Sequence, residues 1–117
     1  MADVLALVDD LFFQVKLAET ARQVGVGVKT FTTGPALLDG VKAESPRLIV
    51  VDLNARQGAL EAIEQLGKSG NSVPVIGFLS HVQVDLAERA RAAGCTQVLP
   101  RSTFTAGLAE ILHQAKM

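Results

Sequence analysis

The sequence predicts an α/β fold in which one parallel sheet carries helices on both faces. The apolar runs 4–8 and 48–51 are continuous rather than alternating, which is typical of strands buried on both faces of a parallel sheet. Five strand-like runs alternate with five helix-like runs along the 117 residues, with short connections. This alternation predicts right-handed crossovers and helices on both sides of the sheet.

The expected strands differ in how strongly they are marked. The run 26–31 alternates between apolar and polar residues, as an edge strand does, whereas the others are more continuously apolar. Each run ends near a polar, glycine or proline residue. The expected strands are residues 4–8, 26–31, 48–51, 73–79 and 97–99.

Apolar residues at helical spacing mark a helix after each strand. Gly25 ends the first helix, and Pro35 suits the first turn of the second. A single last helix is expected, with Ser102 or Thr103 as a candidate N-cap. The apolar positions of the five helices fall within residues 13–24, 33–41, 60–66, 86–93 and 108–115.

The predicted sheet brings acidic residues together. We expect the flavodoxin-like, doubly wound strand order 2-1-3-4-5, which sets the first and third strands side by side. Asp9 and Asp10 follow the first strand, and Asp52 follows the third. The three carboxylates would then meet beyond the carboxyl ends of these strands. Such a cluster repels itself unless a hard cation such as Mg²⁺ neutralises it.

Composition excludes several function classes. The formal net charge of −1 gives no basic surface for nucleic acid or an anionic membrane, and no apolar run is long enough to span a bilayer. A single cysteine, Cys95, excludes an internal disulfide and fits a reducing cytoplasm. We expect Cys95 to be a small buried residue rather than a reactive one.

Several segments, taken in order, resemble the receiver domain of two-component response regulators, including the chemotaxis regulators. The acidic pair and the strand ending in aspartate resemble its phosphorylation site, and the Leu-Pro-Arg segment resembles its Leu-Pro-Lys segment. The resemblance covers essentially all of residues 1–117, as a single domain. Its motifs lie at residues 8–10, 51–54, 74–76, 92–95 and 99–101.

The resemblance implies a role for each acidic residue. Asp52 would accept a phosphoryl group from a sensor histidine kinase or phosphotransfer protein. Asp10, Asp52 and the backbone carbonyl of Asn54 would hold Mg²⁺ weakly, and Asp9 would act through a metal-bound water. The chemistry suits these residue types, because charge on the transferred phosphoryl oxygens must be offset and Mg²⁺ prefers carboxylates and waters.

The sequence also departs from the family pattern. Arg101 stands at the lysine position, followed by Ser102 instead of proline, so we expect a trans peptide bond there and an Arg101 guanidinium paired with Asp52 or a neighbouring acid. Leu79 falls at the hydroxyl position, with Ser80 next to it, and we expect Leu79 to point at the pocket. Val98 replaces the switch aromatic. Switching should therefore be impaired.

Simpler interpretations exist for three features. Asp9 and Asp10 would also be explained as caps of the first helix, although the alignment with Asp52 favours an acidic pocket. Arg56 could pair with the pocket, but a solvated loop charge is the commoner explanation. Of the neighbouring phenylalanines, Phe12 and Phe13, one should face the core and the other should be partly exposed near the pocket mouth or a partner surface.

Two functional hypotheses follow. The first is an atypical receiver in phosphorelay signalling, with at most weak self-phosphorylation and dephosphorylation at Asp52 and otherwise no enzyme activity. The alternative is a degenerate receiver that docks proteins independently of phosphorylation. A flavin-binding or hydrolytic enzyme is disfavoured, because the first loop is acidic and no nucleophile–base pair is evident. We expect a monomer or weak dimer, with a separate output protein bound through the fourth helix, fifth strand and fifth helix.

Overall fold

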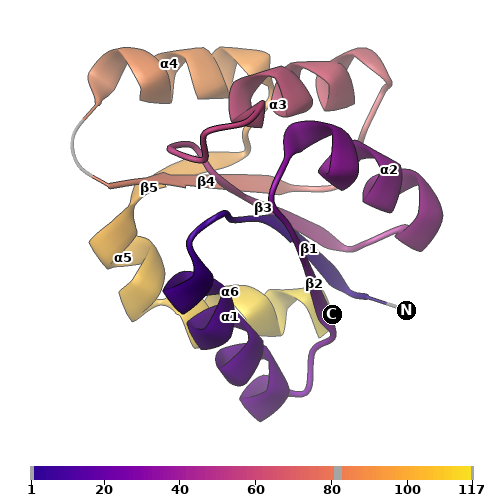
Figure 1. Ribbon diagram of the computed structural model, residues 1–117, viewed down its shortest axis with the longest axis vertical. Helices are drawn as coiled ribbons and strands as arrows, with labels where there is room; N and C mark the ends of the chain where they lie inside the picture. The colour runs from indigo at the N-terminus through magenta and orange to yellow at the C-terminus, as the bar shows by residue number, and fades with distance from the viewer. Residues whose placement is uncertain (1, 81–82, 117) are drawn as a thin grey trace.

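The computed structural model describes residues 2–80 and 83–116, and over this part of the chain five parallel strands form one sheet (Figure 1). The order is β2-β1-β3-β4-β5, so the predicted strand order is confirmed. Every neighbouring pair is parallel. The strands are β1 (Val4–Leu7), β2 (Val28–Phe31), β3 (Leu48–Asp52), β4 (Val75–Leu79) and β5 (Gln97–Pro100).

Helices cover both faces of this sheet. In Figure 1, α2, α3 and α4 lie above it, and α1, α5 and α6 lie below it. None of the helices in the described residues is long and apolar enough to cross a membrane. The helices are α1 (Leu11–Val24), α2 (Gly34–Glu44), α3 (Ala59–Lys68), α4 (Val84–Ala93), α5 (Arg101–Ala106) and α6 (Leu108–His113), followed by the short 3₁₀ turn η1 (Gln114–Lys116).

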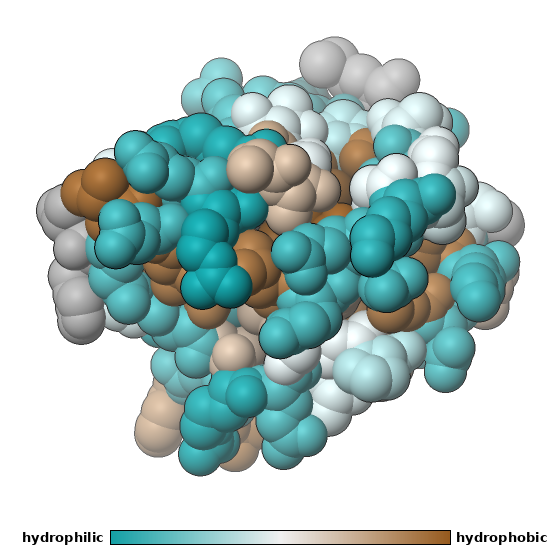
Figure 2. Space-filling model, turned by 90° about the horizontal axis from the view of Figure 1, so that it is seen from above, coloured by the Kyte–Doolittle hydropathy of each residue, from teal (hydrophilic) through white to brown (hydrophobic). Residues whose placement is uncertain are grey.

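Each face of the sheet has its own hydrophobic core. The lower core contains three phenylalanines, with the rings of Phe78 and Phe104 stacked at 4.5 Å and Phe13 at 5.1 Å from Phe78. The upper core, beneath α2, α3 and α4, is mainly aliphatic and includes Leu79 and the buried Cys95. Seen from this upper side, hydrophilic side chains cover the helices and hydrophobic atoms show in the furrows between them (Figure 2).

Local sequence signals account for several helix ends. Gly25 adopts a left-handed conformation (φ 76°) at the end of α1, as expected of a C-terminal glycine. The Thr33 side chain caps α2 by accepting the N–H of Ala36. A left-handed Ser45 ends α2, and the chain then turns into β3.

The last helix differs from the expectation. The prediction of a Ser102 or Thr103 cap is wrong, because α5 begins at Arg101 directly after β5 and both residues lie inside the helix. Pro100, with an extended backbone, takes the N-cap position without a side-chain cap. The helix is also interrupted, since Gly107 separates α5 from α6. This arrangement sets Arg101 at the start of α5, where its guanidinium lies over the ring of Phe13 from α1.

Candidate functional site

The candidate site lies at the carboxyl end of the sheet, where β1 and β3 run side by side. Leu7 pairs with Val51, so the loop carrying Asp9 and Asp10 emerges next to Asp52. Asp52 ends β3 and is only 3% exposed; it is the one buried charged or polar residue among those the structure describes. The fold therefore presents a single buried carboxylate at the edge where the two central strands end.

The environment of Asp52 disfavours its charged form. Burial is the largest effect and raises the pKa of Asp52; the nearby carboxylates of Asp9 and Asp10 act in the same direction. Two contacts oppose this rise: the Asn54 backbone N–H donates to Asp52 Oδ1 at 2.9 Å, and the Arg101 guanidinium lies nearby. A buried anion in this position favours the approach of a cation.

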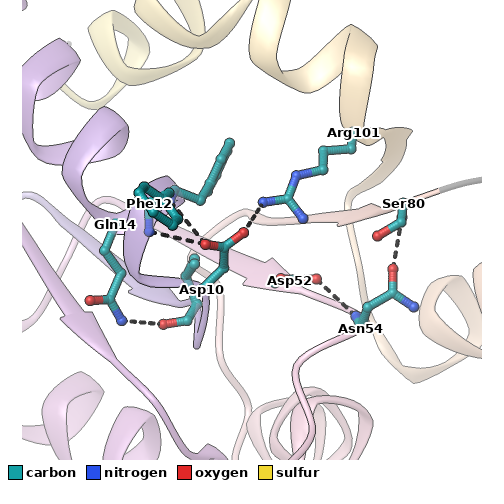
Figure 3. A network of polar contacts seen from close by, with 9 residues as sticks. Asp10, Phe12, Gln14, Asp52, Asn54, Ser80 and Arg101 are labelled. Carbon is teal, nitrogen blue, oxygen red and sulfur yellow. Dashed lines mark hydrogen bonds and ion pairs between the residues drawn. The ribbon is translucent and has the colours of Figure 1, made fainter.

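Asp10 uses its two carboxylate oxygens in different ways. Oδ1 accepts the backbone N–H groups of Phe12 and Phe13 at 3.0 and 3.3 Å, which makes Asp10 the N-cap of α1. Oδ2 accepts a hydrogen bond from Arg101 Nη2 at 2.9 Å (Figure 3). The capping interpretation and the pocket interpretation thus both hold for Asp10, because one carboxylate serves both purposes.

Arg101 is held by aromatic rings as well as by Asp10. Its guanidinium carbon lies 4.6 Å from the ring centre of Phe13 and 5.7 Å from that of Phe78. Its side chain is 28% exposed. The prediction that Arg101 pairs with an acidic residue is confirmed, with Asp10 rather than Asp52 as the partner. The structure has no cis peptide bond among the described residues, as expected after Arg101.

Asp9 turns toward the loop after β3. Its Oδ2 accepts hydrogen bonds from the backbone N–H of Arg56 at 3.0 Å and from Arg56 Nε at 3.3 Å. The backbone hydrogen bond is the largest cause lowering the pKa of Asp9. Arg56 therefore pairs with the pocket, contrary to the commoner expectation of a solvated charge. Its side chain is nevertheless 84% exposed, so solvent screens the ion pair.

Asn54 has contacts that the sequence did not indicate. Its side-chain Oδ1 accepts the backbone N–H of Ser80 at 2.7 Å, and Nδ2 donates to Gln83 Oε1 at 2.8 Å. These bonds link the loop after β3 to the connection between β4 and α4 (Figure 3). They join residues 26 and 29 positions apart, so no local motif could reveal them.

Leu79 does not point at the acidic pocket. In β4 it belongs to the upper core, and Val98 packs against the same core. The side chain next to Asp52 in the sheet is Phe78, its register partner in β4, and successive residues of a strand face opposite sides. The expected direction of Leu79 is therefore wrong. Ser80 is exposed at the rim of the site, above Asn54 in Figure 3.

The acidic residues supply suitable donors for Mg²⁺ but do not form a ready metal cluster. Carboxylates and a backbone carbonyl are the hard oxygen ligands that this ion takes. In residues 2–80 and 83–116, however, no group of three or more acidic, histidine or cysteine side chains is arranged to hold a metal. Asp9 and Asp10 each bind an arginine instead. Ligation by Asp10 requires displacement of Arg101, and the metal assignment remains a prediction.

An apolar surface borders the site. Phe13 is buried in the lower core, while Phe12 is 89% exposed on the first turn of α1, so the expected division between the two phenylalanines is confirmed. Leu11 and Val15 are also exposed large hydrophobic residues on α1. Because Asp10 caps this helix, Leu11 and Phe12 directly follow a pocket residue in the chain, and Val15 lies one turn further along α1.

No protein-family model and no curated protein sequence matches the chain. Solved structures do match. The Vibrio cholerae chemotaxis protein CheY4 has a TM-score of 0.84 and 20% identity, covering 98% of each chain. The signal receiver domain of a putative Luxo repressor protein from Vibrio parahaemolyticus has a TM-score of 0.79 and 19% identity, over 98% of this chain and 92% of the other. NtrX from Brucella abortus matches at a TM-score of 0.79 and 20% identity, over 98% of this chain but 27% of its own.

These likenesses show the fold. The chain has the CheY-like receiver fold of response regulators, with the same strand order and layers. In NtrX the matching part is about a quarter of a longer chain.

Proposed function

We propose that this chain is an atypical receiver domain that acts in phosphorelay signalling, with Asp52 as its phospho-acceptor. The observation that carries the proposal is the buried Asp52 carboxylate at the end of β3 in a receiver fold. Its donor would be a sensor histidine kinase or a phosphotransfer protein. The chain as a whole would act as one domain, and its buried cysteine suits a reducing cytoplasm.

The proposed transfer moves a phosphoryl group from a donor nitrogen to an oxygen of Asp52. The P–N bond breaks and a P–O bond forms, and charge on the phosphoryl oxygens has to be offset. Mg²⁺ held by Asp10, Asp52 and the Asn54 carbonyl, with Asp9 acting through water, would supply that positive charge. Arg101, which stands where the family pattern has a lysine, pairs with Asp10 and would have to release it for the metal to bind there.

We further propose that the response to phosphorylation is impaired. In receivers the signal passes through a hydroxyl on strand four and an aromatic on strand five, as the family resemblance implies. Here both positions hold aliphatic residues, Leu79 and Val98, that pack with the upper core. A ligand shifts a conformational equilibrium only through contacts that differ between the two states, and these side chains offer no hydrogen bond to a phosphoryl oxygen.

A separate output protein would bind on the side of α4, β5 and α5. A groove of about 220 Å³ between α4 and β5 supports this proposal. Leu79 and Val98 form part of its apolar lining, and Glu88 and Arg91 contribute charges. Because the formal net charge is −1 rather than strongly positive, the expected partner is a protein rather than nucleic acid or a membrane. The chain itself would be a monomer or weak dimer.

A second candidate function is phosphorylation-independent docking. The two arginine pairs favour it, because Arg101 and Arg56 already supply the charge that a metal would bring to Asp10 and Asp9. In this case the pocket is a structural element, and partner binding depends little on Asp52. The Asp52→Ala variant should then bind the output partner as tightly as the wild type.

Incubation with acetyl phosphate and Mg²⁺, followed by mass measurement, tests the leading proposal. We expect partial addition of one phosphoryl group to the wild type and none to the matched Asp52→Asn variant. Titration with Mg²⁺ alone should shift the amide resonances of Asp10, Asp52 and Asn54, and more weakly in that variant. If the wild type gains no phosphoryl group and its amide resonances do not shift with Mg²⁺, the phospho-acceptor proposal is contradicted and the docking function remains.

A further inference from the structure

The Asn54 side chain ties the loop after β3 to the start of α4. Its Oδ1 accepts the Ser80 backbone N–H, and its Nδ2 donates to the side chain of Gln83, the residue directly before α4. An amide fits this place because it offers an acceptor and a donor together, whereas a carboxylate offers acceptors only. Both polar atoms of the Asn54 amide thus bind the connection that leads into α4.

Asn54 is also bound to the buried acid. Its backbone N–H donates to Asp52 Oδ1 at 2.9 Å, so hydrogen bonds run without a break from Asp52 through Asn54 to Ser80 and Gln83. Figure 3 shows the first part of this path, from Asp52 to Asn54 and on to Ser80. Neither Leu79 nor Val98 takes part in it.

We infer that Asn54 is a positioning residue that transmits a change at Asp52 to the first turn of α4. Loss of the acceptor on Asp52 frees the Asn54 N–H, and the side-chain bonds carry the resulting movement to Ser80 and Gln83. The path gives α4 a contact that differs between two states of Asp52, which is the requirement for any coupling. It ends at the start of α4, so β5 does not respond.

This inference deepens the proposed function, because it names the route by which that site would act on the output face. The test requires no phosphorylation, so the Asn54 inference and the phospho-acceptor proposal can each be contradicted without the other. The amide spectra of Asp52→Ala and Asp52→Asn are compared with the wild type. Alanine removes the acceptor for the Asn54 N–H, whereas asparagine keeps it. We expect shifts at Ser80, Gln83 and residues 84–87 in Asp52→Ala and their loss in Asp52→Asn.

Equal shifts in the two variants, or none in either, would overturn the inference. Should Asp52→Ala fail to fold, Asp52→Val replaces it, because valine fills more of the space and its side chain carries no acceptor for the Asn54 N–H. Each variant is first checked for a wild-type pattern of amides in the β1 strand, which the path does not touch.

A second comparison separates transmission from a merely structural role. Gln83→Ala removes the acceptor of the Asn54 Nδ2 bond, and Gln83→Glu keeps an acceptor at the same position. In the Gln83→Ala background, the effect of Asp52→Ala on residues 84–87 should be lost, and in the Gln83→Glu background it should remain. Persistence of the effect in Gln83→Ala would contradict transmission through the Asn54–Gln83 bond.

Discussion

The pocket is attached to its two flanking regions in very different ways. On the α1–α5 side, Asp10 binds Arg101 at 2.9 Å, and the guanidinium rests on the Phe13 and Phe78 rings above a stacked aromatic core. On the α4 side, exposed hydrogen bonds from Asn54 reach Ser80 and Gln83. The first attachment is partly shielded from water and should be strong, while the second competes with water and should yield more easily.

This difference indicates which half of the molecule can respond. A signalling domain needs an element whose position changes at little cost, and elements with few buried contacts are the ones that move. Here α1 and α5 hold Asp10 through the partly shielded Arg101 contact and the aromatic core beneath it. The start of α4 is the part that a change at Asp52 is able to displace.

Removing an aromatic ring from the support should have the largest effect. Phe104 is fully buried and stacks on Phe78, so Phe104→Ala should lower the free energy of unfolding by about 3–5 kcal/mol. Val84, exposed at the start of α4, provides the control, and Val84→Ala should change stability by about 0.5 kcal/mol or less. Urea unfolding followed by circular dichroism measures both. Similar losses in the two variants would contradict the comparison.

The next largest effect should be the difference in stability between variants of Arg101 and of Arg56. Arg101→Met breaks the shielded bond to Asp10 and should cost about 2 kcal/mol of unfolding free energy. The matched Arg56→Met variant breaks an exposed pair and should cost about 0.5 kcal/mol or less. Chemical denaturation of the two proteins decides the matter, and a larger loss in Arg56→Met would reverse our ranking of the two attachments.

Arg101 should also restrain the pocket chemically. In Arg101→Lys the planar fork is replaced by a flexible ammonium group, which holds Asp10 less firmly. We therefore expect faster modification of Asp52 by acetyl phosphate and tighter Mg²⁺ binding than in the wild type. Arg56→Lys serves as the control and should leave both nearly unchanged. Slower modification of Asp52 in Arg101→Lys than in the wild type would mean that the guanidinium assists the acceptor rather than blocking access to it.

The buried acid should make stability depend on pH. Because burial raises the pKa of Asp52, the folded state holds this proton more tightly than the unfolded state, whose value is near 3.8. The stabilisation is complete below about pH 4 and is lost as the pH rises through the folded pKa. Relative to Asp52→Asn, metal-free wild type should thus become less stable from pH 4 to 7. A difference that stays constant over this range would argue against a raised pKa.

Cys95 should show the smallest response. It is buried beside Gly77 in the upper core, and burial raises the pKa of its thiol to about 11. At neutral pH the reactive thiolate is therefore scarce. Iodoacetamide should modify native protein far more slowly than protein unfolded in urea. Rapid labelling of the native protein would show that the upper core opens readily.

Much of the fold was predictable because burial leaves a clear trace in the sequence. The continuous apolar runs in β1 and β3 indicated central strands, and the position of Asp52 directly after the apolar run 48–51 indicated its place at the carboxyl end of the sheet. The acidic–basic pairing of Arg101 followed from its place at the lysine position of the resembled family and from the negative charge expected around it. The strands and the residues at their ends could be predicted because the spacing of apolar residues along the chain follows the period of a strand or a helix.

Other features depended on contacts between distant loops. The Asn54 bonds to Ser80 and Gln83 and the turn of Asp9 toward Arg56 arise from loop conformations that no local pattern specifies. The direction of Leu79 was missed because the register of β4 against β3, which sets Phe78 opposite Asp52, was unknown. The break in the last helix did have a signal, since Gly107 lies inside the helical pattern and glycine is a poor residue in a helix interior.

The most direct test of the account is to add beryllofluoride and Mg²⁺ and follow the amide resonances of the whole chain. The adduct mimics a phosphoryl group on Asp52. We predict shifts at residues 8–10, 52–54 and 80 and in the first turn of α4, while β5 and α5 stay close to their original positions. Shifts across β5 and α5 as large as those in the first turn of α4 would contradict the account. Such shifts would mean that phosphorylation is transmitted to β5 and α5 even though Leu79 and Val98 replace the hydroxyl and the aromatic residue.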